Sequence, residues 1–180
     1  MAKYHTKRIG ILGGSFDPAH KGHLTISKIA IKKMNLNIVY WIVAKKNPFK
    51  KKPFYSLKQR ITKAKYIAKK DKSIKVLYID DIIRSSRSIN VIKYLLKNNN
   101  SENLYFIIGS DILLELHKWK SWKKLVKLTK LIVFSRKGYD KKISKTIVVN
   151  YINKKNIIFI NNKPIKISST LLRKKMKKTY

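Results

Sequence analysis

The sequence has 180 residues, a length that fits one domain with a sizeable core, and we expect residues 1–180 to form a single domain. It contains no cysteine, which excludes disulfides and thiolate metal sites. Its 44 lysines and arginines against 8 aspartates and glutamates give a net charge of +36, which favours an anionic partner or substrate.

This charge has two explanations. A nucleic acid or an anionic membrane is one class of partner for so basic a protein. However, the lysines are spread along the whole chain together with abundant Asn and Ile, which indicates a codon bias of the genome. We favour the second explanation and expect no specific nucleic-acid partner. The apolar run before Gly13 is too short for a signal-peptide core or a membrane span, so we expect a cytoplasmic protein without a membrane partner.

Apolar runs alternate with helical spacings along the chain. In chain order we predict a strand at 8–12, a helix at 21–34, a strand at 38–44, a helix at 57–68 capped by Ser56, a strand at 73–79, a helix through 96 capped by Ser88, a strand at 104–108, short helical pieces at 111–128, strands at 130–134, 147–151 and 157–160, and a last helix at 168–177. This alternation implies parallel pairing and a doubly wound, Rossmann-like α/β sheet. Ligands bind beyond the carboxyl ends of the strands in such sheets, so the turns after the strands are the candidate sites.

The turn after the first strand carries the clearest chemical signal. Gly13 and Gly14 let the backbone approach a ligand closely and tolerate a positive φ. Ser15 and the amides that follow it, including that of Phe16, can point at phosphate oxygens. A helix that begins near Lys21 presents free N–H groups that favour an anion. These features predict a phosphate-binding turn.

Two histidines belong to this turn. His20 and His23 are three residues apart, so both can face one pocket if the helix begins between them. Two imidazoles there can donate hydrogen bonds to the charge that grows during phosphoryl transfer. The alternatives are packing residues or a metal pair, and the latter is disfavoured because His5 and His117 lie elsewhere and cysteine is absent. The turn is neither a Walker A loop nor a G-x-G-x-x-G fingerprint.

A second cluster lies near the C-terminus. Ser168, Ser169 and Thr170 offer hydroxyls and free amides at a helix start, and Arg173 follows one turn later. The Arg173 guanidinium can hold phosphate oxygens with its planar fork. An ordinary helix cap with a surface arginine is the alternative.

The segment from Gly14 to His23, G-S-F-D-P-x-H-x-G-H, resembles the signature of the H-x-G-H nucleotidyltransferase superfamily, and is most similar to bacterial nicotinate-nucleotide adenylyltransferases. The segment from Ser168 to Arg173 matches that family's S-S-T-x-x-R motif for triphosphate binding. The resemblance implies transfer of AMP from ATP to nicotinate mononucleotide with Mg²⁺, which the substrate phosphates mainly hold, and release of pyrophosphate. It also implies that His20, His23 and Arg173 stabilise the phosphates during direct in-line attack, with no covalent enzyme intermediate.

Further segments are similar to the same family. Gly109 permits close approach and Asp111 can accept from ribose hydroxyls, although Asp111 is equally typical of a helix N-cap. Trp119 and Trp122 resemble the family's W-x-x-W stretch, which implies that Trp119 stacks on the pyridine ring, while Trp122 is expected in the core.

Two basic residues complete the candidate site. Lys50, in the loop after the second strand, is expected to meet phosphates, and Arg136, after the fifth strand, matches a family position near adenine. A solvated side chain is the alternative at both positions.

The clearest departure from the family is Ser86 to Ile92. The family usually has a sequence such as Y-T-x-D-T-L here, at the nicotinate end of the pocket, whereas this chain has Arg87 in place of Tyr and Asn90 in place of Asp. Ser88 keeps a hydroxyl, and Arg87 is a candidate to meet the nicotinate carboxylate. The departure leaves the choice between nicotinate and nicotinamide mononucleotide open.

Two other functions are alternatives. Phosphopantetheine adenylyltransferases usually have Thr in place of His20 and lack the tryptophan stretch, so they fit less well. A basic nucleic-acid-binding protein on a nucleotide-binding fold would need interleaved surface aromatics or a recognition helix, and the sequence shows neither. The oligomeric state is left open.

Overall fold

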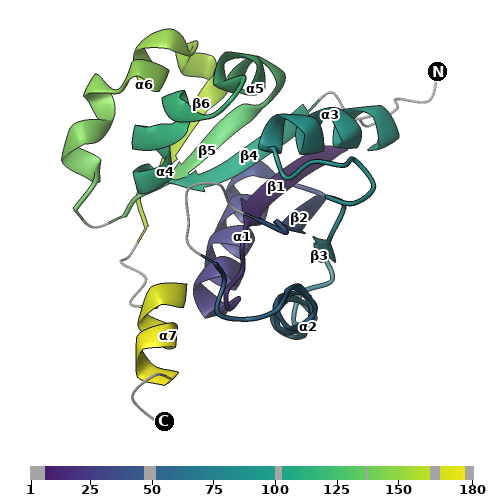
Figure 1. The fold of residues 1–180 in the computed structure, drawn as a ribbon. Coiled ribbons are helices and arrows are strands. Elements are labelled where there is room, and N and C mark those ends of the chain that lie inside the picture. The colour runs from purple at the N-terminus through teal and green to yellow at the C-terminus, as the bar shows by residue number, and fades with distance from the viewer. Residues whose placement is uncertain (1–6, 47–51, 100–102, 137, 163–166, 177–180) are drawn as a thin grey trace.

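The computed structural model describes residues 7–46, 52–99, 103–136, 138–162 and 167–176. Six parallel strands form one sheet in the order β3-β2-β1-β4-β5-β6 (Figure 1). The strands are β1 (Arg8–Gly14), β2 (Ile38–Val43), β3 (Ile74–Leu77), β4 (Asn103–Gly109), β5 (Lys130–Phe134) and β6 (Ile157–Ile160). The order runs outward from β1 in both directions, which confirms the predicted doubly wound sheet.

Helices cover both faces of this sheet. Their bounds are α1 (Lys21–Met34), α2 (Leu57–Ala68), α3 (Ser88–Asn99), α4 (Ser110–Glu115), α5 (Trp122–Leu128), α6 (Ile147–Tyr151) and α7 (Ser169–Met176), with the 3-10 helices η1 (Leu116–Lys118), η2 (Asp140–Lys145) and η3 (Lys154–Asn156). The buried side chains of α1 and α2 pack in one apolar cluster, and those of α3 to α6 pack in a second cluster. The central strands are therefore buried on both faces, which explains their continuous apolar runs.

Local signals explain several element boundaries. Ser56 accepts from the Gln59 amide while the Gln59 side chain accepts from the Ser56 amide, so a capping box begins α2. Helix α1 ends at Asn35, which has a left-handed backbone with φ 50°. In β1, a side chain at Gly10 would place its Cβ 2.9 Å from both Leu36 and Val39, so this strand packs too closely for anything larger than glycine.

The predicted strand at 147–151 is wrong, because these residues form the short helix α6. The Ile-Val-Val run is typical of strands, but the Thr146 hydroxyl accepts from the Val149 amide and caps a helix instead. Val148 is buried while Ile147 is exposed, which a single helical turn permits. The predicted strand at 157–160 is confirmed as β6.

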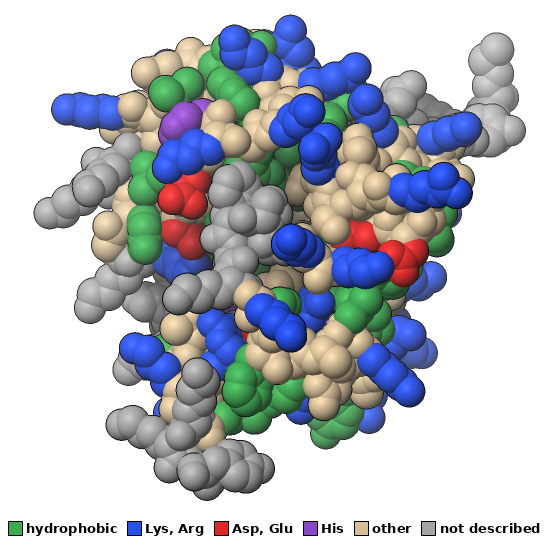
Figure 2. Space-filling model, viewed as in Figure 1, with side chains coloured by type: hydrophobic (Ala, Val, Ile, Leu, Met, Phe, Trp, Pro, Cys, Tyr) green, Lys and Arg blue, Asp and Glu red, His purple; other side chains and the backbone are tan. Residues whose placement is uncertain are grey.

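Lysine and arginine side chains are scattered over the whole visible face of the molecule rather than gathered over one element (Figure 2). Within the described residues, no helix is both long and apolar enough to span a membrane.

Candidate active site

The two histidines of the first turn lie side by side at the start of α1. His20 is the N-cap residue, and its Nδ1 accepts from the Gly22 amide at 3.1 Å. The Nδ1 of His23 accepts from the His20 amide at 3.2 Å, and the ring centroids are 3.9 Å apart. The helix begins between the two residues, as predicted, so both rings lie at the same end of α1.

These contacts decide which ring nitrogen carries the proton. Because each Nδ1 accepts a backbone hydrogen bond, a neutral ring carries its proton on Nε2. Burial, and then the nearby charge of Arg136, lower the pKa of His20 from 6.5 to about 4. At neutral pH His20 is therefore an uncharged N–H donor.

An aromatic layer lies behind His23. The Phe16 ring is 4.9 Å from the His23 ring and is stacked on Trp41 at 5.3 Å. The Trp41 indole donates to the Ser27 hydroxyl at 2.8 Å, and that hydroxyl donates to the His23 carbonyl at 2.8 Å. Ring and backbone of His23 are thus both supported from the core side.

The positive φ of this turn is not at the glycines. Gly13 and Gly14 are the last residues of β1, whereas Phe16 has a φ of 47° and is buried. The tolerance of the glycine pair for a positive φ is therefore not used here, and the left-handed residue is Phe16, whose ring is stacked on Trp41. At Gly13 an added Cβ would meet only Phe106, at 4.0 Å, so the packing of the protein itself leaves room for a side chain there.

The C-terminal motif lies against the first turn. The Arg173 Nη1 donates to the Asp17 carbonyl at 2.6 Å, and the Ser169 hydroxyl donates to the Pro18 carbonyl at 2.9 Å. The Asp17 carboxylate is 3.6 Å from the Arg173 guanidinium. Residues separated by more than 150 positions thus meet, as expected of a site formed from both ends of the chain.

The remaining hydroxyls of this motif have local partners. Ser168 accepts from the Leu171 amide at 3.2 Å and so caps α7, while Thr170 accepts from Arg173 at 3.1 Å. The ordinary helix cap that the sequence left as an alternative is therefore real for Ser168. A second role toward phosphate at these positions stays a prediction.

Sequence reasoning missed Arg60 of α2. This guanidinium is only 2% exposed and donates to the carbonyls of Ser15 at 2.7 Å, Ala44 at 2.8 Å and Lys45 at 3.1 Å. It joins the turn after β1 to the turn after β2, and burial lowers its pKa below the ordinary value. The sequence signal that could have found it is its spacing, because Arg60 lies one helical turn before the buried Ala64 and so on the same face of α2.

Asp111 and Arg136 form an ion pair beyond the ends of β4 and β5. The N-cap of α4 is Gly109, so Asp111 is not an N-cap residue. A Cβ at Gly109 would lie 2.5 Å from the Asp111 Oδ1, so a larger residue here would displace the Asp111 carboxylate. The Ser110 hydroxyl accepts from the Arg136 amide at 3.0 Å and holds the two turns together.

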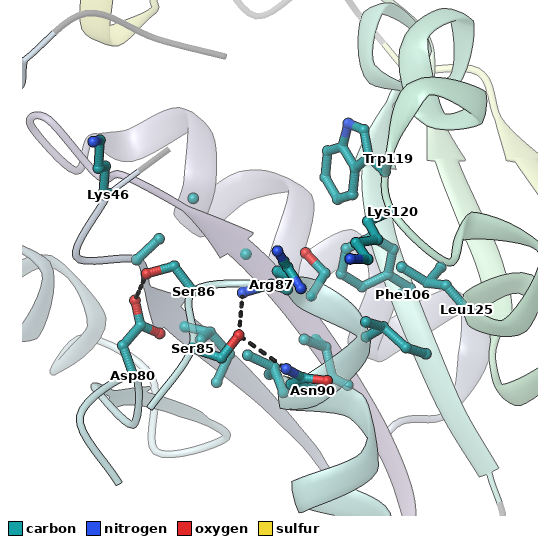
Figure 3. Close-up of a pocket in the computed structure, with 18 of the residues that line it drawn as sticks. Lys46, Asp80, Ser85, Ser86, Arg87, Asn90, Phe106, Trp119, Lys120 and Leu125 are labelled. Atoms are coloured by element: carbon teal, nitrogen blue, oxygen red, sulfur yellow. Dashed lines mark hydrogen bonds between the residues drawn. The ribbon is translucent and has the colours of Figure 1, made fainter. Parts of the chain in front are cut away.

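A cleft of about 770 Å³ opens beside the histidine turn (Figure 3). It is lined by the ends of β1 and β2, by the loop and first turn of α3 at 84–91, and by Phe106 and Trp119. Of the predicted acceptor residues, Arg87, Ser88 and Trp119 line this cleft, whereas Gly109 and Asp111 do not. Gly13 and Gly14, from the predicted phosphate-binding turn, line it as well. Ser88 is the first residue of α3 rather than its cap, because the Arg87 carbonyl receives the first helical amides.

The two tryptophans are both partly buried against the same apolar cluster but differ in their neighbours. Trp119 faces the cleft and meets the edge of Phe106 at 6.3 Å between ring centroids. Trp122 packs at 5.0 Å against Tyr151 and does not line the cleft. Lys50 lies outside the described residues.

Comparison with known proteins agrees with this geometry. The Cytidylyltransferase-like family matches residues 11–175. A curated relative from Pelagibacter ubique (strain HTCC1062), named "Probable nicotinate-nucleotide adenylyltransferase", is 47% identical over 93% of this chain and 92% of its own length. The chain belongs to the nicotinate-nucleotide adenylyltransferase family. A second such adenylyltransferase, from Clostridium tetani (strain Massachusetts / E88), is 33% identical over 96% of this chain and 88% of its own length.

Solved structures share the fold of this adenylyltransferase. Plasmodium falciparum nicotinic acid mononucleotide adenylyltransferase complexed with NaAD matches with a TM-score of 0.73 and 22% identity, over 93% of this chain and 83% of that one. Because the sequence identity is low, this likeness shows that the two proteins share a fold and no more than that.

Proposed function

We propose that this chain transfers AMP from ATP to nicotinate mononucleotide, giving deamido-NAD and pyrophosphate, a step of NAD biosynthesis. The observation that carries the proposal is the pair of Nε2–H donors at the start of α1, beside a cleft walled by Trp119 and Phe106. A phosphate oxygen of the acceptor attacks the α-phosphorus of ATP, the bond to the β-phosphate breaks, and pyrophosphate leaves. No protein nucleophile is required.

The histidines act on charge that develops in the transition state. A neutral His20 donates a hydrogen bond without a proton-transfer step, and His23 lies beside it with the same orientation of its ring nitrogens. Donors that are already oriented lose little reorganisation energy when negative charge accumulates on the phosphate oxygens. The N-terminus of α1 adds the positive end of its helix dipole at the same place.

The ATP phosphates lie between the first turn and α7 in this proposal. Arg173 is 31% exposed in its side chain and is held over the Asp17 backbone, so its remaining N–H groups are available to a triphosphate. Ser168, Ser169 and Thr170 assist from the first turn of α7. Arg136, paired with Asp111, approaches from the ends of β4 and β5, with Asp111 toward the ribose.

Mg²⁺ fits this site as a companion of ATP. Among the described residues, no three His, Cys, Asp or Glu side chains gather to hold an ion without help. The Asp17 carboxylate is occupied by the Phe54 and Tyr55 amides, at 2.9 and 2.8 Å. The substrate phosphates would supply most of the ligands of a bound Mg²⁺, which would neutralise part of their charge.

The test is a side-by-side turnover assay with ATP, Mg²⁺ and three acceptors: nicotinate mononucleotide, nicotinamide mononucleotide and phosphopantetheine. We expect pyrophosphate and deamido-NAD with nicotinate mononucleotide, at the highest kcat/KM of the three. Pyrophosphate from phosphopantetheine alone would replace the proposed function by the sister activity. Pyrophosphate from none of them would overturn adenylyl transfer as the function.

A further inference from the structure

We infer that the side chains of Arg87 and Lys120 together bind the carboxylate of the acceptor and so select a nicotinate over a nicotinamide nucleotide. The inference rests on the proposed function, because it concerns the acceptor of that reaction. It assigns the discrimination to two cations on opposite walls of the cleft, one of them at the position where this chain departs from its family.

The backbone around Arg87 is held firmly. Its amide donates to the Ser85 hydroxyl at 3.2 Å, and its carbonyl accepts from the amides of Asn90 at 3.0 Å and Val91 at 3.2 Å. The Asn90 side chain donates to the same Ser85 hydroxyl at 2.9 Å. The loop and the first turn of α3 are thereby one unit, and Figure 3 shows the Arg87 side chain directed from this unit into the cleft.

Lys120 enters the cleft from the other side. It lies between η1 and α5, next to Trp119, and is followed by Ser121 with a left-handed φ of 60°. Lys120 and Trp119 line the cleft together (Figure 3).

Neither cation is neutralised within the described residues. The ion pairs recorded there include neither Arg87 nor Lys120, whereas the neighbouring Lys118 has Glu115 at 3.8 Å. Asp80 is the acid among the cleft-lining residues, and its Oδ2 already accepts from the Lys45 amide at 2.7 Å and the Ser86 hydroxyl at 2.6 Å. A carboxylate between Arg87 and Lys120 would therefore relieve an unbalanced positive charge.

The aromatic residues indicate which part of the acceptor carries that carboxylate. Phe106 and Trp119 form an edge-on pair on the same wall as Lys120, and this wall suits a planar ring. A carboxylate attached to that ring would reach the two cations, while the ribose phosphate extends away from them toward the histidine turn. Lys46 lies at the end of the cleft opposite Trp119 in Figure 3, so it is placed for phosphate rather than for the ring.

A carboxamide cannot replace the carboxylate at such a site. Its oxygen carries no negative charge and so forms no ion pair with the two cations, and its NH₂ group is a donor that faces other donors. A carboxylate forms hydrogen bonds with these cations in which both the donor and the acceptor are charged. We therefore expect the loss of either cation to penalise the nicotinate nucleotide selectively.

The experiment compares Arg87→Gln, Lys120→Gln and Arg87→Lys with the unaltered protein, using both mononucleotides as acceptors. For Arg87→Gln we expect kcat/KM with nicotinate mononucleotide to fall about 10- to 100-fold, through KM, and kcat/KM with nicotinamide mononucleotide to change by less than about threefold. Lys120→Gln should show a smaller loss of the same kind, and Arg87→Lys an intermediate one. Calorimetric binding of each mononucleotide without ATP gives a readout that does not depend on turnover.

The matched control is Lys124→Gln, which removes the same charge from an exposed site on α5 outside the cleft lining. It should leave the ratio of the two acceptors unchanged. An equal loss with both acceptors in Arg87→Gln, or an unchanged ratio in both glutamine variants, would overturn the inference while the proposed function stands. Absence of turnover by the unaltered protein with either mononucleotide would instead overturn the proposed function.

Discussion

His20 is held as a neutral donor by its surroundings, and this has a consequence for stability. Its folded pKa of about 4 lies below the unfolded value of 6.5, so between these pH values the unfolded chain binds a proton that the folded chain does not. Stability is therefore lost as the pH falls from 6.5 toward 4. We expect the thermal midpoint to fall less between pH 7 and pH 5 in His20→Asn, which keeps an N-cap side chain but does not titrate. Parallel pH profiles of the two proteins would contradict this account.

His23 offers a cleaner test of the chemical role. The variant His23→Gln keeps the capping box, because glutamine at this position also accepts from the N-cap amide, but it moves the donor away from the phosphates. We expect kcat to fall about 100-fold, as for loss of one preorganised donor, and the Kd for ATP to change by less than about threefold. Single-turnover rates and equilibrium ATP binding measure the two effects separately. Weaker ATP binding with unchanged kcat would show a ground-state contact instead.

At the scale of elements, Arg60 joins α2 to the turns after β1 and β2 by donating to three backbone carbonyls. Replacement by methionine keeps most of the side-chain volume but removes the donors to Ser15, Ala44 and Lys45. We expect a loss of about 3 kcal/mol in the free energy of unfolding, since buried carbonyls would lack donors. Urea denaturation measures it, and Lys58→Met on the exposed side of α2 is the control, with a change below about 0.5 kcal/mol. A loss below about 1 kcal/mol for Arg60→Met would refute this role.

Most elements could be predicted because their signals are local. Strands buried on both faces show as apolar runs, and the capping box of Ser56 and Gln59 marks the start of α2. Helix α6 was wrongly predicted as a strand, because its β-branched residues favour a strand. Only the Thr146 cap and the burial of Val148 select a helix there. Local preference was overridden there by packing.

The candidate site likewise has a part that local sequence signals predict and a part that depends on distant contacts. The first turn was predictable because its glycines, its histidines and the start of α1 are consecutive. The contact of Arg173 with Asp17 spans 156 positions, and only the resemblance to a family suggested that the two motifs meet. Arg60 was missed because its partners are backbone carbonyls, which leave no trace in residue type.

For the molecule as a whole, the net charge of +36 is large for 180 residues. The visible face carries lysines and arginines scattered over its surface (Figure 2), and with 44 basic against 8 acidic residues their repulsion is not balanced by opposite charges. Such self-repulsion destabilises the compact state, and the unfolded chain relieves it by expanding. A charge spread in this manner also attracts nucleotides without selecting among them. The destabilisation by self-repulsion and the unselective attraction of nucleotides both come from the net positive charge. Both should therefore weaken as ionic strength rises.

We therefore expect the thermal midpoint to rise as NaCl increases from about 20 to about 300 mM, most steeply at the low end, where the Debye length shortens from roughly 20 Å to roughly 6 Å. Over the same range the KM values for ATP and the acceptor should rise while kcat stays nearly constant, because screening weakens the encounter and not the aligned donors. Binding of an unrelated oligonucleotide should disappear with a steep salt slope and without sequence preference. Oligonucleotide binding that resists 300 mM NaCl and depends on sequence would instead show a dedicated nucleic-acid surface, and would give the charge a function apart from the nucleotide reaction.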